Sequence, residues 1–137
     1  MSKIRVEDEA AIQAVLADSY EAWQAGDANR MVADYTTDAT AIMTGSLRDG
    51  RETVRESMAQ AFAGPLKGSS TLNKQLSIRF IGQDAAIVIS ESAILFPGET
   101  EITDDHRKVN CTWVFERRGA RWLIAAYHNS PVLAPAQ

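Results

Sequence analysis

Apolar residues in the first half of the chain recur at helical spacing. Between Glu7 and Ala25 they return every three or four residues, which predicts one amphipathic helix that ends at Gly26. The members of this stripe are Ile12, Val15, Leu16, Tyr20 and Trp23. Two shorter helices are predicted after it, from Ala28 to about Tyr35 and from about Arg51 to Phe62. A short strand from Ala39 to Thr44 is expected between them.

The second half alternates with period two, as half-buried strands do. In the first such strand, one face is apolar and carries Leu72, Leu76, Ile78 and Phe80. The other face is polar and carries Asn73, Gln75, Ser77 and Arg79. Three further strands are predicted over Ala85–Phe96, Arg107–Arg117 and Arg121–Asn129. Four long strands in meander order predict an antiparallel, twisted sheet, and three helices before it predict an α+β fold with helices on one face.

Length and charge narrow the classes of protein. A chain of 137 residues is the size of one domain, so we expect a single domain over residues 1–137. A hydrophobic content of 45% with a net charge of -4 is typical of a globular protein and gives no electrostatic footprint for nucleic acid or anionic lipid. No apolar run approaches the ~20 residues that cross a bilayer. We therefore expect no nucleic-acid and no membrane partner.

Cysteine usage and the first residues bear on the compartment. Cys111 is the only cysteine, so the chain has no internal disulfide and no cysteine cluster for zinc. The opening segment MSKIRVEDEAA lacks the apolar core of a signal peptide. A cytoplasmic location is the expectation.

Two sequence segments resemble a known family. These are WQAGDANRMVADYTTDATAIM near the start and RRGARWLIAAYHNSP near the end. Together with the order of elements, they resemble the SnoaL-like branch of the NTF2-like superfamily, and most closely its SgcJ/EcaC group. The resemblance implies a cone-shaped α+β barrel that encloses a pocket, and a dimer formed through the outer face of the sheet. Relatives include isomerases, polyketide cyclases, ligand binders and assembly modules, and the SgcJ type is associated with enediyne polyketide biosynthesis.

Glu91 is the first candidate for an acid/base group. It alternates with Ile87, Ile89, Ala93 and Leu95, so a carboxylate interrupts an apolar row. An apolar cavity tunes the pKa of such a group, as a carbon-acid isomerase or cyclase requires of its base. The alternative is that this row faces solvent or a dimer interface, or that Glu91 pairs with an arginine.

His128 is the second catalytic candidate. It shares its predicted face with Trp122, Ile124 and Ala126, at the end of a row that must be buried. In that place it would act as a base, as a hydrogen-bond donor to a ligand, or as a structural latch. If the inner face is the opposite one, Tyr127 and Asn129 take the place of His128.

Aromatic and thioether side chains form the candidate ligand-binding set. They suit a flat, hydrophobic ligand, although any helix packed on a sheet supplies some of them to its core. The set consists of Tyr20, Trp23, Tyr35, Met43, Met58, Phe62 and Trp113. Asp34 and Asp38 flank Tyr35, and Asp38 is better explained as a turn or capping residue. The polyketide cyclases that the fold resembles use an aspartate base, and no matching aspartate on a strand is found here.

Metal and cofactor chemistry lack a sequence signature. His106 and His128 are the only histidines, and neither has a second histidine at ligand spacing. The chain has no glycine-rich phosphate loop, nucleophile elbow or dinucleotide fingerprint. We expect a protein without metal or cofactor.

The polar sheet face predicts a homodimer. It is expected to extend from the first strand across its neighbours and to pack against its copy through a wet, polar interface. Its members are Asn73, Gln75, Ser77, Arg79, Ser90, Ser92, Lys108, Asn110 and Thr112. The alternative is a plain solvated face.

Two functional classes follow from these residues. The first is a cofactor-independent enzyme acting on a hydrophobic polyketide- or polyene-type molecule, with Glu91 and His128 as acid/base groups. The second is a dimeric pocket protein that binds such a molecule without reaction. Protein association is a third and weaker alternative, which the presence of a closed pocket would disfavour.

Overall fold

The structure is a computed structural model that describes residues 3–133. Its helices are α1 (Lys3–Ala25), α2 (Ala28–Met31) and α3 (Arg51–Ala63), with a 3-10 turn, η1 (Asp105–Arg107). Its strands are β1 (Tyr35–Met43), β2 (Ser46–Asp49), β3 (Ser70–Ile81), β4 (Ala85–Leu95), β5 (Lys108–Arg118) and β6 (Arg121–Pro131). The three predicted helices and four long strands are therefore present, which confirms the α+β fold class.

All six strands form one sheet in the order β2-β1-β6-β5-β4-β3. Strands β3 to β6 form the predicted antiparallel meander. The sheet as a whole is mixed, because β1 pairs with β6 in parallel. This pairing joins the helical half of the chain to its last strand, and the prediction of a wholly antiparallel sheet is wrong in this respect.

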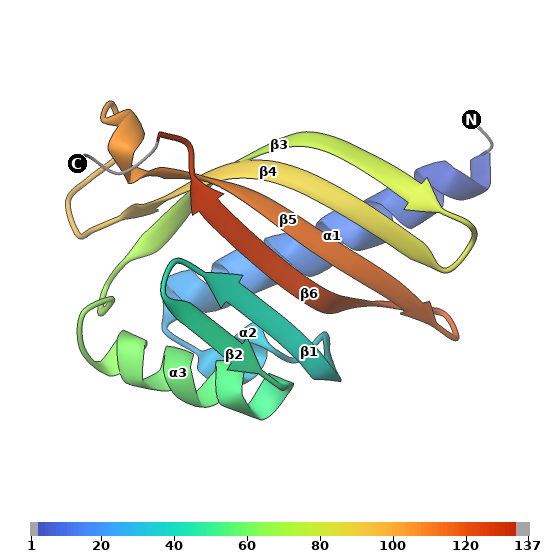
Figure 1. The fold of residues 1–137 in the computed structure, drawn as a ribbon, viewed down its shortest axis with the longest axis horizontal. Helices are drawn as coiled ribbons and strands as arrows, with labels where there is room; N and C mark the ends of the chain where they lie inside the picture. The colour runs from blue at the N-terminus through green and yellow to red at the C-terminus, as the bar shows by residue number, and fades with distance from the viewer. Residues whose placement is uncertain (1–2, 134–137) are drawn as a thin grey trace.

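The helices cover one face of the curved sheet, as Figure 1 shows. Helix α1 crosses the long strands, and α3 packs beside β1 and β2. The core between the layers is built from side chains that include Ile12 on α1, Val54 on α3, and Phe115 and Ile124 on the sheet. We call the helix side of the sheet its inner face and the opposite side its outer face.

The second helix is shorter than predicted. Asp27 caps its N-terminus by accepting a hydrogen bond from Arg30 N at 3.0 Å, but the helix ends after one turn. The backbone of Asp34 then accepts from Ile124 N at 2.8 Å, and Tyr35 pairs with Ile124. Pairing with β6 therefore begins β1 at Tyr35, four residues before the predicted start at Ala39.

Two β-bulges reverse the alternation of side chains. In β6, Ala126 and Ile124 oppose Val114 and Phe115 of β5, which leaves Ala125 as an extra residue. In β3, Gln75 and Ser77 oppose Ser90 and Ile89, which leaves Leu76 as the extra residue. An extra residue moves every following side chain to the other face. Both bulges lie in strands from which the sequence predicted functional residues.

Within residues 3–133, no helix is long and apolar enough to span a bilayer.

Candidate functional site

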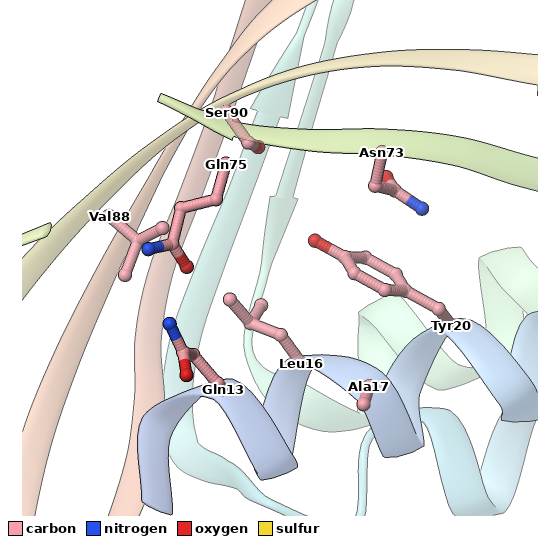
Figure 2. Close-up of a pocket in the computed structure, with 8 residues that line it drawn as sticks. All are labelled: Gln13, Leu16, Ala17, Tyr20, Asn73, Gln75, Val88 and Ser90. Carbon is pink, nitrogen blue, oxygen red and sulfur yellow. The ribbon is translucent and has the colours of Figure 1, made fainter. Parts of the chain in front are cut away.

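A cavity of about 170 Å³ lies on the inner face, between α1 and the strands β3 and β4. Figure 2 shows Gln13, Leu16 and Tyr20 of α1 pointing toward the side chains of the two strands. Its lining consists of Gln13, Leu16, Ala17, Tyr20, Asn73, Gln75, Val88 and Ser90. A cavity of roughly 150 Å³ holds one benzene ring, so this one suits a small ligand.

Helical spacing on α1 and strand alternation explain how the lining forms. Gln13, Leu16 and Tyr20 recur every three or four residues and so share one helix face. Opposite them, Asn73 pairs with Ser92 and Gln75 pairs with Ser90. The bulge at Leu76 directs the side chains of Asn73 and Gln75 to the inner face. The amides of Gln13 and Gln75 extend toward one another from the two walls (Figure 2).

Ser90 is the most deeply buried polar group of this lining. It is 2% exposed, and its Oγ has no hydrogen-bond partner among the described residues. A buried hydroxyl without a partner costs free energy, so native structures normally satisfy it with protein, water or ligand. Ser90 therefore leaves an unsatisfied hydrogen-bonding group in the wall of the cavity.

Tyr20 and Cys111 are neutral neighbours of Ser90. Burial, with repulsion from an ionised Cys111, raises the pKa of Tyr20 to about 12, and the Ser90 hydroxyl opposes the shift. Burial also raises the pKa of the Cys111 thiol. Ser90 is thus near enough to stabilise the ionised forms of both groups, although it makes no hydrogen bond of normal geometry in the neutral protein.

Tyr127 and Asn129 continue this polar cluster along β6. Asn129 Nδ2 donates to Tyr127 Oη at 2.8 Å, and Tyr127 Oη lies 3.3 Å from Cys111 Sγ. Burial is the main cause of the raised pKa of Tyr127. The cluster is therefore a set of neutral hydrogen-bonding groups at neutral pH.

Aromatic rings pack beside this cluster on the inner face of the sheet. The ring centroids of Trp113 and Tyr127 are 4.4 Å apart, and Tyr20 meets Trp113 edge-on at 6.4 Å. Trp113 Nε1 is buried and has no partner among the described residues. The inner face thus offers unpartnered donors next to apolar rings.

Glu91 lies on the outer face with its side chain 33% exposed, as the alternative interpretation had it. On β4 the inner residues are Val88 and Ser90, which line the cavity, so Glu91 points away from it. Lys108 Nζ lies 3.9 Å from Glu91 Oε1. Both faces of β4 carry branched apolar residues, and this is why alternation alone selected the wrong one.

His128 also lies on the outer face and is exposed. Trp122 and Ile124 are buried as predicted, at 3% and 0% exposure. The bulge at Ala125 then reverses the order, so Tyr127 and Asn129 point inward, as the alternative had it. The structure therefore does not bring Glu91 and His128 together over the cavity.

The predicted ligand-binding set is mostly core. Tyr20 lines the cavity, and Trp113 contacts both Tyr20 and Tyr127. Trp23 stacks edge-on against Phe62 at 5.5 Å and donates to Ser69 Oγ at 2.9 Å. The remaining members, Tyr35, Met43, Met58 and Phe62, belong to the hydrophobic core or pack against it.

Asn73, Gln75 and Ser90 line the cavity, although alternation predicted that they belong to the outer, polar face. The polar face predicted from alternation is in fact divided between the two sides of the sheet. Lys108, Asn110 and Thr112 point outward, whereas Asn73, Gln75 and Ser90 point inward. A run of amides opposite serines was the available signal. Because the bulge at Leu76 cannot be recognised in the sequence, this run of amides could not be assigned to the inner face.

Metal-binding groups do not cluster in the described part of the chain. Between residues 3 and 133, no three His, Cys, Asp or Glu side chains lie close enough to hold an ion. Of the eight lining residues, Tyr20 alone is ionisable, and its raised pKa keeps it neutral. The site supports hydrogen bonding and apolar contact.

The protein is an α+β cone that holds a neutral cavity between its long helix, α1, and its sheet. Among solved structures, it is similar to a domain of unknown function with a cystatin-like fold from Nostoc punctiforme, with 24% identity and a TM-score of 0.84. That match covers 98% of this chain and 81% of the other. A family model described as a SnoaL-like domain matches residues 12–135, and the chain belongs to this family.

Two further structures share the fold. An NTF-2 like protein of unknown function from Shewanella oneidensis has 18% identity and a TM-score of 0.75, over 89% of this chain and 98% of that one. A hexachlorocyclohexane dehydrochlorinase, LinA-type3 from Novosphingobium barchaimii, has 16% identity and a TM-score of 0.77, over 94% and 89%. No curated protein matches the chain. At these identities the solved structures show the fold and not the activity.

Proposed function

We propose that this protein binds a small hydrophobic molecule in the cavity between α1 and strands β3 and β4. The observation that carries the proposal is the buried, unpartnered hydroxyl of Ser90 in the wall of a cavity that is also lined by Leu16, Ala17 and Val88. Apolar walls supply most of the affinity in such sites, and a few polar groups orient the ligand. A non-catalytic binding role fits this lining better than acid/base catalysis.

The chemistry of the lining supports binding over reaction. A carbon-acid isomerase or cyclase needs a carboxylate or an imidazole within reach of its substrate. None of the eight lining residues carries one, and Glu91 and His128 lie on the outer face. The resemblance to the SgcJ/EcaC group extends the proposal to a polyketide- or polyene-type ligand, for which the protein would act as an accessory binder.

The test uses ethylbenzene as an apolar probe and ligand-observed NMR. Ala17 is exposed and lines the cavity, so Ala17→Phe fills the entrance without overpacking the core. Ala14 is exposed on the same helix outside the lining, and Ala14→Phe is the matched control. We expect the parent protein and Ala14→Phe to bind the probe and Ala17→Phe to lose it. Equal binding by all three proteins would contradict the proposal, as would a parent protein that binds no neutral aromatic probe of this size.

A homodimer through the outer face remains a second proposal. Its support is the exposure of large apolar side chains on the outer face of the sheet: Ile42, Leu72, Leu76 and Ile81 are 42%, 44%, 50% and 52% exposed. Ile87 and Ile89 lie between them on β4. Exposed apolar groups on adjacent strands, such as β3 and β4, are typical of an interaction surface, whereas single ones are common on any protein. Such an interface is more apolar than the sequence predicts.

A further inference from the structure

We propose that the ligand of this cavity is uncharged and carries an acceptor oxygen, such as a ketone carbonyl, which binds the hydroxyl groups of Ser90 and Tyr20. This inference rests on the proposed function, since it names the ligand class of the same site. It follows from which groups of the cavity are already hydrogen-bonded, which are not, and where charge is found.

The first step is the supply of donors. Ser90 Oγ is buried and unpartnered, and it lies near Tyr20, whose hydroxyl points from α1 toward the two strands (Figure 2). Trp113 Nε1 is a second buried donor without a partner, and its ring contacts that of Tyr20. A ligand that brings only apolar surface would leave Ser90 unsatisfied, whereas an acceptor oxygen removes that cost.

The second step is the arrangement behind Ser90. Tyr127 Oη accepts from Asn129 Nδ2, so its own proton is free to be donated to Cys111 Sγ, 3.3 Å away. Cys111 pairs with Ser90 across the strands, and its sulfur is therefore already supplied with a donor. Neither group requires the Ser90 proton. The Ser90 O–H is left to be donated into the cavity.

The third step is charge. The lining has no arginine, lysine, histidine or carboxylate, and its remaining polar groups are the amides of Gln13, Asn73 and Gln75. An ionised ligand would lose its hydration without gaining an opposite charge, which is unfavourable. A neutral oxygen loses far less on entering, so the site selects against carboxylates and ammonium groups.

Three probes of one size separate these features. Acetophenone carries a carbonyl, ethylbenzene replaces that group with apolar surface, and benzoate carries a charge. Titration by calorimetry, with NMR competition for weak binders, is expected to rank acetophenone first. One neutral hydrogen bond corresponds to about a fivefold preference over ethylbenzene. Benzoate is expected not to bind.

Two serine variants test the assignment to Ser90. Ser90→Ala is expected to weaken acetophenone about fivefold and to leave ethylbenzene unchanged. The carbonyl stretch of bound acetophenone should lie at lower frequency in the parent than in this variant. Ser69 is equally buried, but its hydroxyl donates to Leu66 O at 2.6 Å and accepts from Trp23. Ser69→Ala should therefore lower the melting temperature and leave the preference for acetophenone intact.

Stability provides a readout independent of the ligand. Because the Ser90 hydroxyl has no partner, Ser90→Ala is expected to preserve or raise the melting temperature of the free protein. Tyr20→Phe, which removes the second hydroxyl, should also reduce the preference for acetophenone. These two variants keep the test open should either fail to fold.

The outcomes distinguish the inference from the function beneath it. Benzoate binding more tightly than acetophenone, or equal affinity for acetophenone and ethylbenzene, would overturn the inference and leave the binding function standing. If none of the three probes binds, both proposals fail. Preference for acetophenone that persists in Ser90→Ala and in Tyr20→Phe would show that other groups bind the carbonyl, and would overturn the assignment.

Discussion

Tyr127 and His128 are neighbours in the chain, and the bulge at Ala125 decides that Tyr127 is the inward one. Tyr127 packs on Trp113 and hydrogen-bonds with Asn129 and Cys111. His128 points to the outer face, where it is exposed. Because of this one extra residue, the buried row ends in the phenol of Tyr127 and not in the imidazole of His128.

This exchange predicts different costs for two adjacent substitutions. Tyr127→Phe leaves the Asn129 amide without its acceptor and should lower the free energy of unfolding by about 1 kcal/mol. His128→Ala removes an exposed side chain and should change it by less than about 0.5 kcal/mol. Urea unfolding followed by tryptophan fluorescence measures both. A larger loss for His128→Ala would place the imidazole, rather than the phenol, in the folded interior.

The sequence predicted the layers of this fold but not the phase of its strands. Helical spacing from Ile12 to Trp23 correctly indicated a long helix over a sheet, because that period leaves little choice of face. In β6, Trp122 and Ile124 were likewise placed correctly. Beyond Ala125 every assignment is reversed, since a bulge depends on cross-strand pairing and leaves no mark in the local pattern.

The same reason accounts for the site. Asn73 and Gln75 precede the bulge at Leu76, so they point into the cavity, while Ile78 and Phe80 beyond it pack on the core as predicted. On β4, alternation was present, but branched residues on both faces hid its direction. Tyr20 was the one lining residue included in the predicted binding set, because its helix face was unambiguous.

A buried ionic cluster predicts strong dependence on Asp8. This carboxylate is 9% exposed and accepts from Trp122 Nε1 at 3.2 Å and from Arg117 at 3.4 Å, with Arg5 at 3.7 Å. Asp8→Ala leaves these donors without an acceptor and should lower the free energy of unfolding by about 3 kcal/mol. The exposed neighbour Glu7 is the control, and Glu7→Ala should be nearly neutral in the same urea experiment. Equal effects of the two variants would mean that the cluster does not anchor α1 to the sheet.

The segment between β4 and η1 should loosen in acid. Two hydrogen bonds from Arg107, with help from the Phe96 backbone, hold the pKa of Glu99 at about 2. Because this pKa lies below that of the unfolded chain, the stabilisation is complete above about pH 4.5 and is lost as the pH falls toward 2. Amide hydrogen exchange over residues 96–107, with allowance for the intrinsic pH dependence of exchange, should show reduced protection across that window.

Two glutamine variants control this experiment. Glu99→Gln should show reduced protection at every pH and remove the titration. Glu101→Gln, at an exposed position in the same segment, should preserve it. A titration that survives in Glu99→Gln would assign the effect to another carboxylate.

Alkaline stability should decline before any phenol of the folded protein ionises. The chain has three tyrosines, and burial raises the pKa of each: that of Tyr20 to about 12, and those of Tyr35 and Tyr127 as well. Phenols of the unfolded chain ionise near pH 10, so the free energy of unfolding should fall progressively as the pH rises from about 10 toward 12. Phenolate absorbance should then appear together with the loss of tryptophan-reported structure. A phenolate step near pH 10 in the still-folded protein would contradict the burial of these three side chains.

The homodimer proposal is tested by a charge placed in the centre of the outer face. Ile89 lies there on β4, between Ser77 and Thr112 on the neighbouring strands. In a dimer through this face, Ile89→Glu would bury two like charges across the symmetry axis, so it should shift the mass toward that of one chain. Val6 is a large apolar residue, 63% exposed on α1, and Val6→Glu is the matched control that should leave the dimer intact. Light scattering at two concentrations measures the mass, and a parent protein that stays near 15.0 kDa at both would exclude the dimer. A dimer that survives Ile89→Glu and dissociates with Val6→Glu would instead place the interface on the helical side.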